Sequence, residues 1–98
     1  MKYVQLVEYA TSKPEEVDQL MSDWVAATDG KRTAMRSVTG KDRDRANSFV
    51  EIVEFPSYEE AMRNSQLPET IAFADKVTAL CDSGPTFRNL DVVREDAL

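Results

Sequence analysis

The segment from Phe49 to Phe55 constrains the fold of this chain more than any other, because it predicts a strand with apolar side chains on both faces. Such a strand belongs in the middle of a sheet and is covered on both sides. A single layer of helices covers only one of these faces. The other face needs a partner, and the simplest partner is the same sheet of a second copy. We therefore expect a homodimer formed through sheet faces.

The segments around this strand predict the order β-α-β-β-α-β in a single domain, residues 1–98. Alternating apolar residues indicate strands, and apolar stripes at helical spacing indicate helices. We expect strands at residues 3–9, 32–39, 48–55 and 86–94, and helices at about 14–28, 58–65 and 69–82. This order predicts an α+β, ferredoxin-like fold with an antiparallel four-stranded sheet and helices on one face.

The first helix is the clearest element in the sequence. Its apolar residues recur at helical spacing along one side: Val17, Leu20, Met21, Trp24 and Val25. Ser12 is placed to cap its first turn, and Pro14 stands where a missing N–H does no harm. Trp24 either packs in the core or contacts a ligand, and its indole N–H needs a partner if it is buried.

The second helical region begins with a capping box and is broken by a proline. Ser57 is placed to accept a hydrogen bond from the backbone of Glu60. Pro68 interrupts the helix before it restarts, and Asn64 lies at the polar break before this proline. Such a break often lines the mouth of a pocket. A plain kink over the sheet is equally consistent with the sequence.

Apolar run lengths and cysteine content predict the compartment. No apolar run approaches the roughly 20 residues that cross a bilayer. The strand that starts at Tyr3 leaves no room for a signal peptide before it. The lone Cys81 has no partner for an internal disulfide, which fits a reducing compartment. We expect a cytoplasmic protein without membrane contact.

The net charge of −6 falls on residues 50–98, whereas acids and bases balance in residues 1–49. An acidic surface repels the phosphate backbone, so we expect no nucleic-acid partner. Lys41, Arg43 and Arg45 alternate with aspartates in one predicted loop. That pattern is typical of a solvated hairpin tip.

The absence of histidine excludes several kinds of catalytic site. A Ser-His-Asp triad, a haem held by a proximal histidine and a zinc site built on histidine all require this residue. The sequence contains neither the spacing of a calcium loop nor a phosphate-binding glycine loop. We expect no metal and no cofactor.

Tryptophan, tyrosine, arginine and asparagine remain as groups for binding a ligand. Arg36 interrupts an apolar strand face, so it either forms an ion pair with Glu51 or Glu8 or binds an anion. Tyr9 either donates its phenol to a ligand or caps the end of the sheet. No catalytic residue is assigned. The candidate substrate-binding residues are Tyr9, Trp24, Arg36 and Asn64.

The segment from Glu54 to Met62, followed by Pro68 and Phe73, resembles a region of the dimeric α/β-barrel superfamily. More narrowly, it is similar to the antibiotic-biosynthesis-monooxygenase-like proteins. There a strand ends in an acid and an aromatic residue, and a short helix opens with Ser-x-Glu-x-Ala. The resemblance implies two ferredoxin-like subunits joined sheet to sheet, each with a cavity between its sheet and its helices.

Proteins of this kind include cofactor-independent oxygenases of polyphenols, haem-degrading enzymes and proteins without known activity. The resemblance to the oxygenases implies that an electron-rich substrate anion reduces oxygen itself, so the protein supplies a dry pocket and donors for that anion. Many relatives carry histidines in the short helix and just after its proline. Here those positions hold Asn64 or Ser65, and Glu69 or Thr70, which removes haem degradation from the expected activities.

We therefore expect a dimeric α/β-barrel protein that binds a small apolar or aromatic molecule. If the protein is an enzyme, we expect a cofactor-independent monooxygenase-like activity. The alternative is a non-catalytic ligand-sensing or dimeric interaction module. An open cavity of roughly a few hundred Å³ beside Trp24 favours the enzyme, because ligand sites have that size, and a solid core favours the module.

Overall fold

The computed structural model describes residues 1–98 and has the element order β-α-β-β-α-α-β. The strands are β1 (Tyr3–Ala10), β2 (Arg36–Lys41), β3 (Ser48–Phe55) and β4 (Ser83–Asp91). The helices are α1 (Pro14–Ala27), α2 (Tyr58–Ser65) and α3 (Pro68–Leu80). All strand pairs are antiparallel, in the spatial order β2-β3-β1-β4. The ferredoxin-like prediction is confirmed, with β3 in the interior of the sheet.

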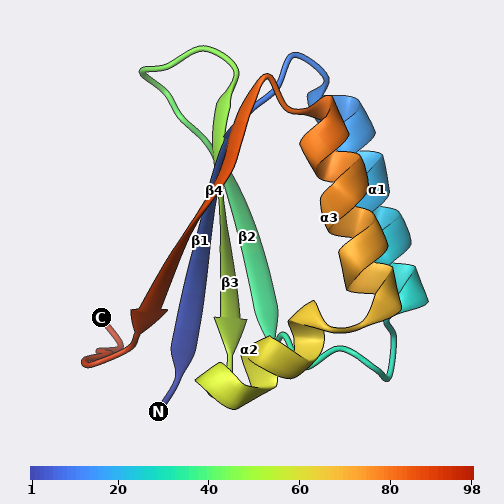
Figure 1. The fold of residues 1–98 in the computed structure, drawn as a ribbon. Coiled ribbons are helices and arrows are strands. Elements are labelled where there is room, and N and C mark those ends of the chain that lie inside the picture. Colours follow the sequence, from blue (N-terminus) through green and yellow to red (C-terminus); the bar gives the residue numbers. More distant parts are fainter.

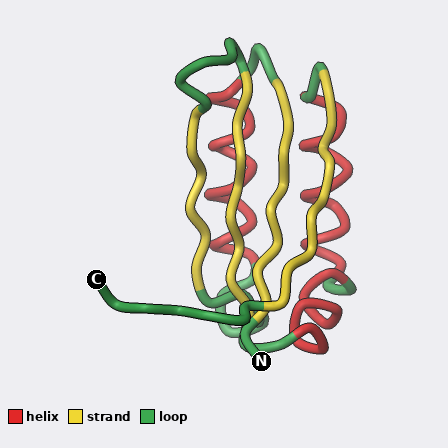
Figure 2. Tube along the Cα trace, turned by 90° about the vertical axis from the view of Figure 1, so that its left-hand side faces the viewer, coloured by secondary structure: helices red, strands yellow, loops and turns green.

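The helices lie on one side of the sheet only. Figure 1 shows α1 and α3 side by side along one face, with the short α2 across one end of the sheet. Figure 2 shows the four strands in front of the helices, so the face turned to the viewer carries no helix. The residues after β4 leave the sheet in the same view. None of the helices is both long and apolar enough to cross a membrane.

Strand register determines which side chains point toward the helices. In β1 these are the residues of odd number, and their partners on β3 share the same face because side chains alternate along a strand. The helix-facing pairs are Tyr3 with Phe55, Gln5 with Val53, Val7 with Glu51, and Tyr9 with Phe49. The residues between them face the uncovered side, which is rich in apolar side chains: Val4, Leu6, Val38, Val50, Ile52 and Leu90.

The buried core is small and lies at one end of the sheet. Tyr3 and Phe55 are 5% and 3% exposed, and they pack with Ala61 of α2. Their rings are tilted at a centroid distance of 6.1 Å, and Tyr58 meets Tyr3 edge to face at 5.6 Å. Only nine of the 98 residues are buried, so the fully buried core is small for a chain of this length.

The predicted capping by Ser12 is wrong. Helix α1 begins at Pro14 with Lys13 as its N-cap, and no side chain caps this end. The buried Thr11 instead accepts a hydrogen bond from the Lys13 N–H at 3.0 Å and donates to the Leu80 carbonyl at 2.7 Å. The hydroxyl that organises this turn is therefore one residue earlier than the sequence pattern indicates.

Several strand boundaries also differ from the predicted ones, and β2 ends at Lys41 and β4 at Asp91 rather than at residues 39 and 94. Strand β2 begins at Arg36 rather than at residue 32, because the chain first pairs with β3 through the N–H of Met35, which donates to the Glu54 carbonyl at 2.8 Å. Strand β4 begins at Ser83, before residue 86. Gly84 permits this, because it has φ +81° and a Cβ there would lie 2.6 Å from the carbonyl oxygen of Glu8.

The predictions for β3, for the proline break and for the cap of α2 are confirmed. Pro68 begins α3 after a short turn, so the second helical region consists of two separate helices. The Ser57 hydroxyl accepts a hydrogen bond from the Glu60 N–H at 3.2 Å. The start of α2 at its Ser57 cap and the start of α3 at Pro68 are therefore both set by local chemistry.

Ser57 and Ser12 form a matched pair for testing these caps. Ser57→Ala is expected to destabilise the protein by about 1 kcal/mol, because it removes a helix cap. Ser12→Ala is expected to change stability by less than about 0.5 kcal/mol, because this exposed side chain makes no hydrogen bond. Chemical denaturation of the two variants measures both values. Equal losses in the two variants would contradict the assignment of Thr11 to the first turn of α1.

Candidate functional site

A cavity of about 440 Å³ lies between the helix-facing side of the sheet and the pair α1 and α3. Hydrophobic residues make up 14 of its 24 lining residues, so its walls are mainly apolar. Helices α1 and α3 pack against each other more closely than either packs on the sheet. The cavity therefore takes the place that core side chains fill in most small domains.

All four candidate residues contribute to the lining of this one cavity, although they come from separate elements. Tyr9 lies on β1, Trp24 on α1, Arg36 at the start of β2 and Asn64 near the end of α2. Their distance from one another does not follow from local patterns in the sequence. The fold brings them together because α1 and α2 approach the same face of the sheet (Figure 1).

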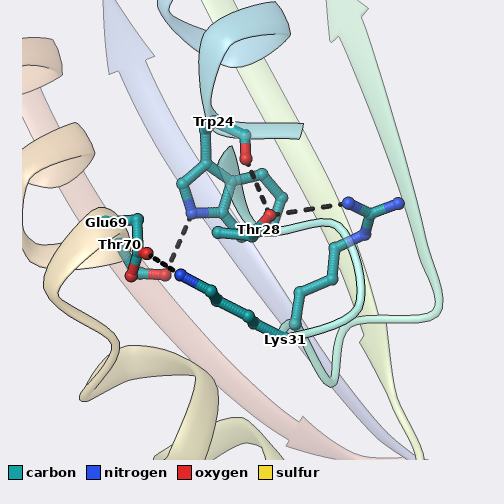
Figure 3. Close-up of polar contacts among 6 residues, drawn as sticks. Trp24, Thr28, Lys31, Glu69 and Thr70 are labelled. Atoms are coloured by element: carbon teal, nitrogen blue, oxygen red, sulfur yellow. Dashed lines mark hydrogen bonds and ion pairs between the residues drawn. The ribbon is translucent and has the colours of Figure 1, made fainter. Parts of the chain in front are cut away.

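Trp24 forms part of the helical wall and bridges α1 to α3. Its indole Nε1 donates to the hydroxyl of Thr70 at 2.9 Å (Figure 3). Its ring packs against Phe73 with the centroids 5.9 Å apart. In the same network the Trp24 carbonyl accepts a hydrogen bond from the buried Thr28, and Lys31 pairs with Glu69 at 2.7 Å. The indole is thus held in place at the end of the cavity.

Asn64 offers a donor to the cavity. It is 6% exposed, and its Oδ1 accepts a hydrogen bond from the Thr33 N–H at 3.2 Å. This bond fixes the orientation of the amide, because only the oxygen accepts from a backbone N–H. No hydrogen bond within the chain uses Nδ2, and no fully buried side-chain nitrogen lacks a partner. The NH₂ group is therefore accessible from the cavity.

Tyr9 supplies a phenol that stays protonated. Its ring stacks on Phe49 at a centroid distance of 5.6 Å. Burial, and then the nearby carboxylates of Glu51 and Asp18, raise the pKa of Tyr9 to about 12. At neutral pH its O–H is therefore a hydrogen-bond donor to a ligand oxygen rather than an anion.

Arg36 stands at the margin of the site. It is exposed and lies opposite Glu54 in the strand register, on the face away from the helices. It forms neither of the ion pairs weighed from the sequence. Glu51 accepts a hydrogen bond from the Ser37 hydroxyl at 2.9 Å, and Glu8 lies 3.9 Å from Arg88.

Glu51 is the cavity residue that sequence reasoning missed as a site residue. Its side chain belongs to the helix-facing row of β3 that also carries Phe49, Val53 and Phe55. Burial raises its pKa, and the hydrogen bond from Ser37 offsets only part of this effect. The sequence indicates an unusual position here, because an acidic residue lies among apolar residues of the same strand face. It was read there only as a partner for arginine.

The site offers donors and a carboxylate rather than a metal centre. No group of three or more histidine, cysteine, aspartate or glutamate side chains is placed to hold a metal ion. Tyr9 and Asn64 present O–H and N–H groups, and Glu51 presents a proton acceptor. This combination in an apolar space suits proton transfer from a ligand and stabilisation of the resulting oxyanion.

The half-buried charge of Glu51 predicts a pH-dependent cost to stability. Because its pKa is higher in the folded state, the folded protein binds this proton more tightly than the unfolded chain does. Stability from this group is complete below the ordinary pKa of 4.5 and is lost as pH rises through the folded-state pKa. Glu51→Gln is therefore expected to raise the melting temperature at neutral pH.

Thermal unfolding across pH measures this effect, and the gain from Glu51→Gln is expected to disappear in acid. Glu59→Gln is the control, because this substitution removes the same charge from an exposed position on α2. A melting temperature lowered by Glu51→Gln at neutral pH would contradict the inferred burial cost.

Comparisons with known proteins define the fold. No family model matches the sequence, and no curated protein matches it. Among solved structures, SnoaB, a cofactor-independent oxygenase from Streptomyces nogalater, is 16% identical with a TM-score of 0.80, covering 96% of this chain and 95% of its own. A candidate antibiotic biosynthesis monooxygenase from Caulobacter crescentus is 10% identical with a TM-score of 0.82, covering 95% and 91%.

Rv0793 from Mycobacterium tuberculosis is 10% identical with a TM-score of 0.80, and the match covers 99% of this chain and 100% of that one. These alignments extend over nearly the full length of each chain, and they include the order of strands and helices. The chain has the ferredoxin-like fold of the antibiotic biosynthesis monooxygenase-like proteins.

Proposed function

We propose that this protein binds a small aromatic molecule in the cavity and catalyses its cofactor-independent oxygenation. The observation that carries the proposal is the open, mainly apolar cavity of about 440 Å³ that borders Trp24, Asn64 and Tyr9. Its volume lies in the range of small-molecule sites, roughly 300–1,000 Å³. The likeness in fold to SnoaB, which is a cofactor-independent oxygenase, supports the same reaction class.

The reaction class requires no group beyond the substrate and oxygen. An electron-rich aromatic CH₂ group supplies all four electrons that reduce O₂, and its two protons end in the water formed. One oxygen atom enters the substrate as a carbonyl, and the other leaves as water, so atoms and electrons balance. The protein's task is to favour the substrate anion and to exclude bulk water, which an apolar cavity with a few fixed donors achieves.

The candidate residues take separate roles in this proposal. The free NH₂ group of Asn64 donates to the oxygen on which negative charge develops, and the Tyr9 hydroxyl is a second donor. Trp24 holds the aromatic rings of the substrate against the helical wall, since its own N–H is used by Thr70. Arg36 has no role at the bound ligand in this proposal, because its side chain lies on the sheet face away from the helices.

Oxygen uptake with a hydroxyanthrone, a soluble electron-rich aromatic compound with a reactive CH₂ group, tests the activity. Asn64→Ala is expected to lower kcat by about 100-fold, the usual cost of losing one oxyanion donor. Trp24→Phe is expected to raise KM more than it lowers kcat. Ser65→Ala, a change in the next residue on the exposed side of α2, is the control. Uptake unaffected by the Trp24→Phe and Asn64→Ala double variant would rule out these roles.

A non-catalytic ligand-sensing role is the second candidate, and one observation favours it. The indole N–H of Trp24 and the amide oxygen of Asn64 already have partners within the chain, so fewer free donors face the ligand. This role predicts saturable binding of the same compound without oxygen uptake. The oxygen electrode therefore separates the two functions directly.

We also infer that two copies of the chain associate through the uncovered sheet face. Apolar residues form the centre of this face, and Ile52 is 38% exposed there in the single chain. Charged residues lie toward its margins, where Glu8 is 3.9 Å from Arg88. An apolar centre with a charged rim is typical of a homodimer interface.

Ile52→Glu is expected to convert the dimer into a monomer, because it places a carboxylate in the centre of the interface. Light scattering coupled to size exclusion measures the mass. Ile71→Glu is the control, since Ile71 is 51% exposed on α3, away from this face. A wild-type monomer in dilute solution would contradict the dimer.

A further inference from the structure

Glu51 has a position that the proposed function does not use. It lies in the interior strand β3, with Val7 of β1 and Thr39 of β2 on either side. Its carboxylate therefore projects from the middle of the sheet toward the cavity, between apolar neighbours of the same row. A charge in such a place is costly unless it has a role or a partner.

The carboxylate has a single hydrogen bond within the chain. Its Oε2 accepts from the Ser37 hydroxyl at 2.9 Å. No hydrogen bond uses Oε1, and no fully buried side-chain oxygen lacks a partner, so Oε1 keeps accessible surface in a residue that lines the cavity. An ionised carboxylate accepts several hydrogen bonds, and most of that capacity is therefore available to a ligand.

No cation neutralises this group. Glu51 takes part in no ion pair within 4.0 Å. The other charged or titratable side chains at the cavity are Tyr9, Asp18, Arg32 and Arg36. Arg32 is engaged elsewhere, because its guanidinium donates to the carbonyl of Val25 at 2.8 Å.

We propose that Glu51 accepts the proton of a phenolic or enolic O–H on the ligand, and that it thereby restricts the site to neutral ligands carrying such a donor. This inference rests on the proposed function, because it concerns the same cavity and the same aromatic ligand. It adds a proton acceptor and a ligand class that the four candidate residues do not supply.

The proton step conserves charge inside the cavity. The ligand O–H bond breaks, its electron pair stays on the ligand oxygen, and the proton bonds to Oε1 of Glu51. One negative charge is present before and after the step, since it moves from the carboxylate to the ligand. The neutral carboxylic acid then donates its O–H to the new oxyanion.

Charge conservation also sets the ligand class. A ligand that arrives as a carboxylate or phosphate would place a second negative charge beside Glu51 in an apolar space, which is strongly unfavourable. A methyl ether has no proton to give and leaves Oε1 without a partner. Burial raises the pKa of Glu51, which brings its basicity closer to that of a phenol and aids the transfer.

Binding of a matched ligand pair tests this recognition without any turnover. A dihydroxyanthraquinone and its dimethyl ether are already oxidised and differ in whether the two oxygens carry a proton or a methyl group. Isothermal titration calorimetry is expected to show that the wild type binds the hydroxy compound about 10- to 100-fold more tightly, as for a hydrogen bond to a charged group. Glu51→Gln is expected to lose most of this preference, and Glu59→Gln is expected to keep it.

Oxygen uptake with the hydroxyanthrone is the second measurement. Glu51→Gln is expected to lower kcat and to make the rate rise steadily with pH, because hydroxide then replaces the carboxylate as base. A hydroxy preference that survives in Glu51→Gln would overturn the inference, and so would an unchanged pH profile. Circular dichroism confirms that the variant is folded before either measurement.

The outcomes separate this inference from the proposed function. Oxygen uptake that does not depend on Glu51 would leave the proposed function standing and overturn the role of Glu51. A Glu51-dependent hydroxy preference without oxygen uptake would support the recognition and contradict the oxygenation. A wild type that binds neither anthraquinone would contradict both.

Discussion

The attachment of α1 and α3 at their ends is the constraint on which the cavity depends. At one end the fully buried Thr11 donates to the carbonyl of Leu80 at 2.7 Å, which links the start of α1 to the end of α3. At the other end Trp24 donates to Thr70 at 2.9 Å (Figure 3). Because these contacts position the helix pair at both ends, its middle does not have to pack on the sheet, and the space above β1 and β3 stays open.

This arrangement leaves the chain with little buried core for its size. The main cluster consists of Tyr3 and Phe55 of the sheet and Ala61 of α2, at one end of the sheet. The rest of the helix-facing row borders the cavity, and the opposite face has no helix over it (Figure 2). A ligand in the cavity would stabilise the folded state, and so would a second copy of the chain on the uncovered sheet face. Each binds the native form and thereby shifts the unfolding equilibrium.

Local chemistry explains which parts of the fold could be predicted from the sequence. The two-sided apolar pattern of β3, the cap at Ser57 and the break at Pro68 depend on neighbouring residues, and all three predictions are confirmed. The turn before α1 was not, because whether Ser12 or Thr11 meets the backbone depends on where the end of α3 lies. The start of β2 depends likewise on its pairing with β3, which no local pattern specifies.

The site was predicted in part for the same reason. Trp24 and Asn64, which line the cavity, can be picked out from the sequence because a wide side chain in a helical stripe and an amide at a proline break are visible locally, and their role in binding stays a prediction. The significance of Glu51 was missed, because alternation places it in a row with Phe49 and Val53 but does not say what covers that row. This row lines a cavity rather than a packed core because α1 and α3 pack on each other and not closely on the sheet.

The carboxylate of Glu51 affects the protonation of the Tyr9 phenol, and the two groups are a hydrogen-bond acceptor and a donor, respectively. Burial and then this carboxylate raise the pKa of Tyr9 to about 12, so the phenol remains a donor at neutral pH. A donor and an acceptor therefore coexist on adjacent strands of one apolar wall. If Glu51 were replaced by an apolar residue, the sheet would pack more favourably, but the cavity would keep donors alone. A carboxylate without a cation partner in such a wall costs stability, and groups of this kind occur more often at functional sites than in cores.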